Sequence, residues 1–112
     1  MKIYHNPRCR KSREGLQILE ESGKEFEIVK YLNEVPSKEE LKSILEKLNY
    51  KALDLVRTNE KDWKENFKGK ELSEEEIIEA MLTYPKLIER PIVVSSDQAV
   101  VGRPPEKIKN LL

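Results

Sequence analysis

The stretch KIYHNPRCRKSREGLQILEESGKEFEIVKYL, residues 2–32, carries the pattern that decides the fold. Residues 2–5 form a short segment rich in β-forming side chains, which predicts a strand. Residues 9–24 predict a helix, because apolar side chains group on one side and Gly23 stands where a helix commonly ends. The alternation over residues 25–32 predicts a second strand. Two strands joined by a helix form a βαβ unit, so we expect these strands to be parallel.

The middle of the chain is expected to be helical. Two segments begin with a serine followed three residues later by a glutamate, which is the sequence form of a capping box. A third segment has two aromatic residues at i and i+4, which predicts a short helix. The residues concerned are Ser37 with Glu40, Ser73 with Glu76, and Trp63 with Phe67.

The C-terminal part of the chain predicts a hairpin and a helix. Residues 92–95 and 98–101 are apolar strand segments, and the two residues between them provide the turn. Residues 103–112, RPPEKIKNLL, predict a closing helix, since proline suits the first helical turn. Its inward-facing side chains are expected to be Ile108, Leu111 and Leu112.

Together these elements predict an α/β protein with a mixed four-stranded sheet in the order β-α-β, then helices, then β-β-α. This is the thioredoxin-like arrangement. At 112 residues the chain has the size of one domain. We therefore expect a single domain over residues 1–112, with a helical insertion at about 36–89.

The composition excludes several functional classes. The chain has 21 basic and 21 acidic residues and no net charge, which argues against a general nucleic-acid binder. No apolar run approaches the roughly 20 residues needed to cross a bilayer. A single cysteine allows no intramolecular disulfide and, with no leader peptide evident, indicates a reduced cytoplasmic location. One cysteine and one histidine cannot build a metal site alone. We also expect the protein to be a monomer.

The one cysteine, Cys9, lies at the predicted start of the first helix. Free amide groups and the helix dipole stabilise a thiolate there, and a group of cations surrounds it in the sequence. The Ser12 hydroxyl, one turn on, is expected to donate a hydrogen bond to the sulfur. The alternative is an inert buried thiol, which polar, turn-forming neighbours disfavour. The neighbouring cations are Arg8, Arg10, Lys11 and Arg13.

The spacing of the segment is Cys-x-x-Ser, so a resolving thiol is absent. Whatever bonds to Cys9 must be released by an external thiol. His5, four residues upstream, could lower the thiol pKa as a cation, accept its proton as a base, or only cap the strand end. These alternatives remain open on sequence alone.

Three distant arginines stand out by position. Arg90 and Arg103 each precede a proline, which places them in extended loops rather than on helix faces, and Arg57 follows an apolar segment. In a thioredoxin-like sheet the loop before the third strand lies beside the thiol, so Pro91 is the candidate cis-proline. Guanidinium groups suit tetrahedral oxyanions. The alternative is that each arginine is an ordinary surface residue.

Five blocks of the chain resemble the bacterial arsenate reductase family that depends on glutathione and glutaredoxin. The resemblance covers nearly the whole chain. HNPxCxxSR and LIxRPIVV together are its most specific motifs. The blocks are IYHNPRCRKSRE (3–14), YLNEVPSKEEL (31–41), ALDLVRTNE (52–60), MLTYPKLIERPIVV (81–94) and VVGRPPE (100–106).

The resemblance implies reduction of arsenate to arsenite through a thioarsenate adduct on Cys9. Glutathione would act as co-substrate and glutaredoxin as protein partner, with no bound cofactor, no metal and no direct contact with nucleic acid. Arg57, Arg90 and Arg103 would hold arsenate or a similar oxyanion. His5, Asn6 and Ser12 would support the thiolate.

Two other functions compete with arsenate reduction. A thiol oxidoreductase of the same family could act on glutathione mixed disulfides, and its cationic site would bind glutathione carboxylates. The related Spx-type regulators bind RNA polymerase, but their redox switch is Cys-x-x-Cys, and here Ser12 replaces the second cysteine. The family's best-characterised enzymes have Gly-Thr after the nucleophile, where this chain has Arg10-Lys11, which bears on the choice of substrate.

Overall fold

A computed structural model describes the whole chain, residues 1–112. The chain divides into two compact units. The first unit comprises Met1–Glu34 and Arg90–Leu112, and the second comprises Val35–Glu89. The second unit corresponds to the predicted helical stretch, and the first holds the predicted sheet.

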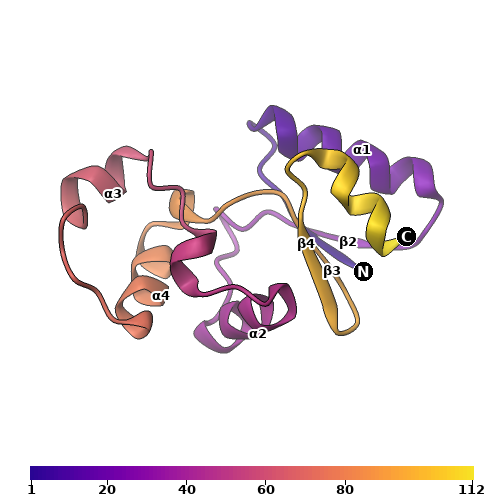
Figure 1. The fold of residues 1–112 in the computed structure, drawn as a ribbon. Helices are drawn as coiled ribbons and strands as arrows, with labels where there is room; N and C mark the ends of the chain where they lie inside the picture. Colours follow the sequence, from indigo (N-terminus) through magenta and orange to yellow (C-terminus); the bar gives the residue numbers. More distant parts are fainter. The chain divides into compact units, whose positions relative to one another are not determined.

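The first unit has the predicted thioredoxin-like topology (Figure 1). Its four strands lie in the order β2-β1-β3-β4. Strand β1 is parallel to β2 and antiparallel to β3, and β3 and β4 form the predicted hairpin. The elements are β1 (Lys2–Tyr4), α1 (Arg10–Ser22), β2 (Glu27–Val29), β3 (Ile92–Ser95), β4 (Gln98–Val101) and η3 (Pro105–Leu111).

Strand β2 is shorter than the predicted strand over residues 25–32. It is an edge strand whose only partner is β1, and β1 ends at Tyr4. The last hydrogen bond between the two segments joins the His5 N–H to the Val29 carbonyl at 2.8 Å. Beyond Val29 there is no partner strand, so the chain turns despite its alternating pattern.

Helix α1 and the 3-10 helix η3 pack side by side against the sheet (Figure 1). The paired strand residues Ile3 and Val93 contribute to this core, together with Leu19 of α1 and Ile108 of η3. All four side chains are fully buried. Helix α1 ends as predicted at Gly23, which adopts the left-handed conformation at φ 74°.

The closing segment is a 3-10 helix, and this corrects one core prediction. Ile108 is fully buried and Leu111 packs against the core, but Leu112 is 39% exposed. With three residues per turn, side chains at i and i+3 lie on the same side. Ile108 and Leu111 satisfy that spacing, whereas Leu112 would face inward only on an α-helix.

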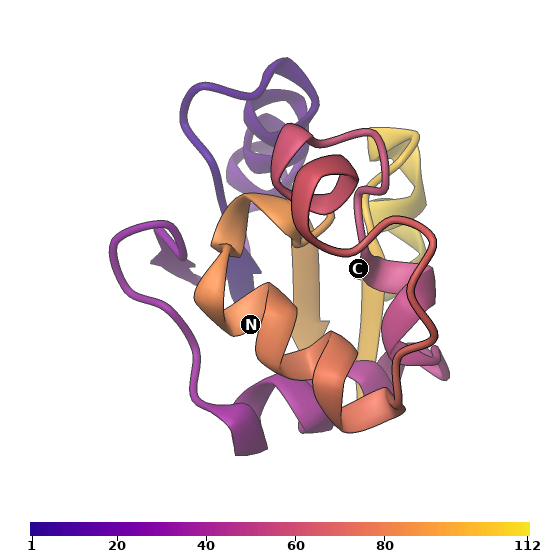
Figure 2. The ribbon, with the colours of Figure 1, turned by 90° about the vertical axis from the view of Figure 1, so that its left-hand side faces the viewer.

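The second unit is helical, and its helices can be followed by colour in Figure 2. Helix α4 packs against α2 and against the 3-10 helices η1 and η2. The caps follow the sequence: the Ser37 hydroxyl accepts the Glu40 N–H, and Ser73 and Glu76 form a reciprocal capping box. The elements are α2 (Lys38–Leu48), η1 (Ala52–Leu55), α3 (Lys61–Asn66), α4 (Glu74–Thr83) and η2 (Pro85–Leu87).

The predicted aromatic pair forms on α3. The ring centroids of Trp63 and Phe67 are 5.3 Å apart, and Phe67 also meets Tyr84 edge-on at 5.8 Å. Pro85 ends α4 and begins η2, because proline cannot continue an α-helix.

No helix of the chain is both long and apolar enough to span a membrane.

Candidate functional site

Cys9 occupies the N-cap position of α1, as the sequence predicts. Its backbone is extended, at φ −98° and ψ 122°, and its carbonyl accepts the N–H of Arg13 at 3.0 Å. The Asn6 carbonyl in turn accepts the Cys9 N–H at 3.0 Å. The loop therefore presents a partly exposed thiol at the positive end of the helix dipole.

Arg103 contacts the thiol from the far end of the chain. Its Nη2 lies 3.5 Å from Sγ of Cys9, and its Nε donates a 2.8 Å hydrogen bond to the carbonyl of Arg90. One guanidinium thus bridges the thiol and the loop before β3. Held at two points, it has little rotational freedom.

The pKa of the Cys9 thiol lies below its ordinary value of 9.0. Burial alone would raise it, because a charged sulfur loses solvation. Four contributions lower the pKa and together outweigh the effect of burial. They are a hydrogen bond from the Arg90 side chain, one from the Ser12 backbone, and the charges of Arg90 and Arg103. The thiolate is therefore favoured mainly by the two distant arginines and the helix N-terminus.

Ser12 supports the loop differently from the prediction. Its hydroxyl is fully buried, accepts the Asn6 N–H at 2.9 Å and lies 2.7 Å from Nδ1 of His5. The hydrogen bond that lowers the pKa of Cys9 comes from the Ser12 backbone. The predicted bond from hydroxyl to sulfur is thus replaced by a hydroxyl that ties His5 and Asn6 to α1.

His5 and Asn6 are both buried and both shape the loop. Burial, followed by the charge of Lys30, lowers the pKa of His5 below 6.5. This favours the neutral ring, which disfavours the predicted alternative of a cationic histidine. The Asn6 side-chain oxygen accepts the Arg8 N–H at 3.0 Å, closing the turn before the thiol.

Arg10 and Lys11 associate with a carboxylate of their own helix. Nε of Arg10 lies 3.1 Å from Glu14, and Nζ of Lys11 lies 3.8 Å from it. The Arg10 side chain is 84% exposed. The first turn of α1 therefore directs both bulky side chains toward Glu14, one turn along the helix.

The peptide bond between Arg90 and the cis-proline candidate Pro91 is cis, as is the bond between Arg103 and Pro104. Two glycines leave room for the Pro91 ring. A Cβ at Gly15 would lie 2.8 Å from Cγ of Pro91, and one at Gly102 would lie 3.0 Å from it. Sequence reasoning missed this packing, whose only signal was a glycine inside the predicted helix.

The third arginine, Arg57, lies in the second unit with partners of its own. The segment 55–57 pairs with the segment 87–89. Val56 and Ile88 form an isolated bridge, the Arg57 N–H donates to the Leu87 carbonyl, and the Glu89 N–H donates to the Leu55 carbonyl. Across them, Nη1 of Arg57 lies 2.8 Å from the Glu89 carboxylate. A second carboxylate, Glu60, lies 3.7 Å from Nε. Sequence reasoning did not identify these acids.

A pocket of about 250 Å³ opens on the first unit beside the loop that carries Cys9. Strand β2 leads into one wall, and the loop after β1 forms the other. Sequence analysis did not single out Lys30 or Asn33, although both follow a strand parallel to β1. The lining residues are His5, Asn6, Pro7, Arg8, Lys30, Leu32 and Asn33.

The chain contains no group of three or more histidine, cysteine or acidic side chains that could hold a metal ion. The site brings together one thiol with a lowered pKa, two guanidinium groups and a hydrogen-bonded His-Ser pair.

Comparisons with known proteins identify relatives of the whole chain. Residues 4–111 match the family model described as "ArsC family". An Escherichia coli protein described as uncharacterized is 46% identical, with 100% of this chain and 96% of that protein covered. A Neisseria meningitidis protein named arsenate reductase is 42% identical, with 100% and 97% covered. The solved structure of an arsenate reductase from Vibrio cholerae has a TM-score of 0.93 at 45% identity, covering 100% of this chain and 98% of that one.

Proposed function

This chain belongs to the ArsC family, and on that premise we propose that it is an arsenate reductase with Cys9 as nucleophile. The observation that carries the proposal is the contact between Arg103 and the thiol, 3.5 Å from Nη2 to Sγ, in a site where the Cys9 pKa is lowered. A thiolate held between guanidinium groups can attack an anion, because the cations offset the repulsion between the two negative charges.

In the proposed reaction the Cys9 thiolate attacks the arsenic atom and forms a Cys9 S–As bond. One arsenate hydroxyl takes up a proton from solvent, its bond to arsenic breaks, and it leaves as water. Glutathione then attacks the Cys9 sulfur. The S–As bond breaks, its electron pair stays on arsenic, and arsenite leaves with arsenic reduced from the +5 to the +3 state. The remaining mixed disulfide is reduced by glutaredoxin, because the chain has no second cysteine.

Each arginine has a proposed role. Arg90 and Arg103 stabilise the thiolate before attack and the developing charge on the oxyanion during attack. Arg57 is proposed as the third ligand on the family resemblance, and it would exchange its Glu89 contact for the oxyanion. His5, Asn6 and Ser12 position the loop through the buried hydroxyl of Ser12.

The test is arsenate-dependent NADPH consumption in an assay coupled through glutathione and glutaredoxin. The wild-type chain is expected to turn over arsenate, and Cys9→Ser is expected to abolish turnover. Lys61→Ala is a matched control on an exposed cation of the second unit. Absence of turnover with glutaredoxins of several types would refute arsenate reduction. A glutathione adduct on Cys9 without arsenate binding would instead identify an oxidoreductase of glutathione mixed disulfides.

A further inference from the structure

Strand β1 ends between two different sets of side chains. Tyr4, its last residue, pairs with Val29 of β2 on one side and with Ile92 of β3 on the other. The chain leaves β2 at Lys30 and enters β3 from Pro91, so both flank the loop after β1. The β3 side provides Arg90 and Arg103 to the thiol. The β2 side provides the pocket of about 250 Å³.

The residues that line the pocket include two cations. They are Arg8 and Lys30, and the lining also includes Asn6 and Asn33. Neither Arg8 nor Lys30 forms an ion pair in the chain, whereas Arg10 and Lys11 both pair with Glu14. No acidic residue lines the pocket, so its chemistry suits a carboxylate or a similar small anion.

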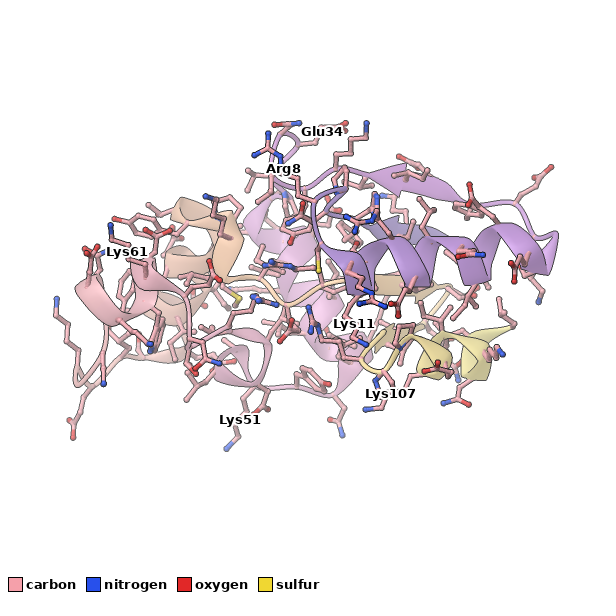
Figure 3. The ribbon with its side chains drawn as sticks, turned by 90° about the horizontal axis from the view of Figure 1, so that it is seen from above. Arg8, Lys11, Glu34, Lys51, Lys61 and Lys107 are labelled. Carbon is pink, nitrogen blue, oxygen red and sulfur yellow. The ribbon has the colours of Figure 1, made fainter.

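The two cations line the same pocket. The Lys30 charge contributes to the lowered pKa of His5, so the ammonium lies close to that ring. Figure 3 shows Arg8 on the side of the turn that ends at Glu34, and Lys11 on the opposite side of α1 near Lys107. Of the cations flanking Cys9 in sequence, Arg8 therefore belongs to the pocket and Lys11 does not.

We propose that this pocket binds a carboxylate of the thiol that releases Cys9 from its adduct. The ligand class is a small peptide thiol with a free carboxylate, as in glutathione. The inference rests on the proposed function only in requiring that Cys9 be released by an external thiol, and the absence of a second cysteine requires the same.

The pocket lies beside the loop that carries Cys9, as such a donor requires. Lys30 directly follows Val29, whose carbonyl accepts the His5 N–H at 2.8 Å, so Lys30 and His5 follow the same ends of two neighbouring strands. Arg8 adjoins Cys9 in the chain. One extended residue spans about 3.5 Å, so a tripeptide with its thiol at the central residue carries each carboxylate at least one residue length from its sulfur, and the pocket begins at the residue before Cys9. The oxyanion and the donor would then approach the thiol from different sides of β1.

The step that the pocket assists is thiol exchange. The donor thiolate attacks the Cys9 sulfur, a bond forms between these two sulfurs, and the bond from Cys9 to its previous partner breaks with the electron pair leaving on that partner. This step can be measured without arsenate if Cys9 carries a neutral leaving group. A mixed disulfide with 2-thiopyridine provides one, because it releases uncharged pyridine-2-thione.

The experiment compares three thiols on that mixed disulfide: glutathione, glutathione diethyl ester and 2-mercaptoethanol. Lys30→Ala and Arg8→Ala are expected to lower the rate at which glutathione releases pyridine-2-thione by about 3- to 10-fold. That is the size of one lost exposed charge contact in a partly enclosed site. The rates with the ester and with 2-mercaptoethanol are expected to stay close to wild type. Lys11→Ala is the matched control, and it should leave all three rates unchanged. Added salt should reduce the preference for glutathione over the ester.

Two results would overturn the proposal. The first is that Lys30→Ala and Arg8→Ala react with glutathione as fast as the wild-type chain. The second is that the variants slow all three thiols equally, since that outcome would reflect the reactivity of the Cys9 sulfur and not recognition of a carboxylate. Because the assay contains no arsenate, a chain that fails to reduce arsenate can still pass this test, and the two failures are distinguishable.

Discussion

Nη2 of Arg103 lies 3.5 Å from Sγ of Cys9, although the two residues are 94 positions apart in the chain. The same guanidinium is anchored through Nε to the Arg90 carbonyl at 2.8 Å. Arg103 therefore links the two loops that meet at the end of β1. A lysine could not make both contacts, because its ammonium is a single point on a flexible stem.

Arg90→Gln is expected to raise the pKa of the Cys9 thiol. The Arg90 side chain makes the largest contribution that lowers this pKa, through a hydrogen bond and its charge. A higher pKa means less thiolate at neutral pH, so alkylation by iodoacetamide should slow several-fold at pH 7. The measurement is the midpoint of the alkylation rate against pH. Lys11→Ala should leave that midpoint in place, and an unchanged midpoint in Arg90→Gln would contradict the assigned role.

Ser12→Ala is expected to destabilise the protein by about 1–3 kcal/mol. The substitution leaves the buried Asn6 N–H without its acceptor and the His5 ring without its hydroxyl partner. Urea unfolding measures the loss. A change below about 0.5 kcal/mol, the range of ordinary surface substitutions, would show that the hydroxyl is not a structural link.

Gly15→Ala is expected to destabilise the first unit by about 1–3 kcal/mol, even though alanine favours helices. The added Cβ would lie 2.8 Å from Cδ1 of Ile108 and 2.8 Å from Cγ of Pro91. Ile108→Val removes the first of these atoms. In that background Gly15→Ala should therefore cost less, with only the Pro91 contact left. Strictly additive effects in the double variant would exclude the Ile108 contact as a cause.

Glu89→Gln is expected to tighten the binding of arsenate by about 2- to 5-fold. The Glu89 carboxylate lies 2.8 Å from Nη1 of Arg57 and would compete with the oxyanion for that guanidinium. Isothermal titration of both chains with arsenate gives the two affinities. Glu60→Gln should have a smaller effect, since its carboxylate lies 3.7 Å away. Weaker binding by Glu89→Gln would indicate that Glu89 positions Arg57 and does not compete for it.

His5 should make the free energy of unfolding depend on pH just below neutrality. Its pKa in the folded protein is lower than its ordinary value of 6.5, so the unfolded chain binds this proton more readily. Its contribution to stability is therefore complete above pH 6.5 and is lost as pH falls through the folded pKa. Urea titrations between pH 7 and pH 5 measure the slope, and His5→Gln should reduce it. An equal slope in both chains would contradict the assignment.

Local sequence patterns predicted most of the secondary structure. The serine caps at Ser37 and Ser73, the stop at Gly23 and the β3–β4 hairpin depend on neighbours within a few positions, and each forms as expected. The two errors depended on tertiary partners. Residues 25–32 lack a partner strand beyond Val29, and the 3-10 geometry of η3 turns Leu112 away from the core.

In the candidate site, too, the local features were predicted from the sequence and the tertiary contacts were not. Sequence alone identified Cys9 as a thiol at a helix N-terminus and singled out Arg90 and Arg103, because residue types and their place beside turns are local facts. Sequence could not assign hydrogen bonds among several possible partners. The Ser12 hydroxyl bonds to His5 and Asn6, and Arg57 contacts Glu89.

The amino-acid sequence by itself determined the order of elements, the family motifs and the position of the one thiol, Cys9. Tertiary structure decided which of the 21 basic residues lie close enough to the thiol to stabilise its thiolate. Arg10 and Lys11, closest in sequence, associate with Glu14 on their own helix, while Arg103 reaches the sulfur from the other end of the chain. The reason is physical: the electrostatic effect of a charge depends on its distance in space and its competing partners, and the pairing of β1 with β2 and β3 sets both.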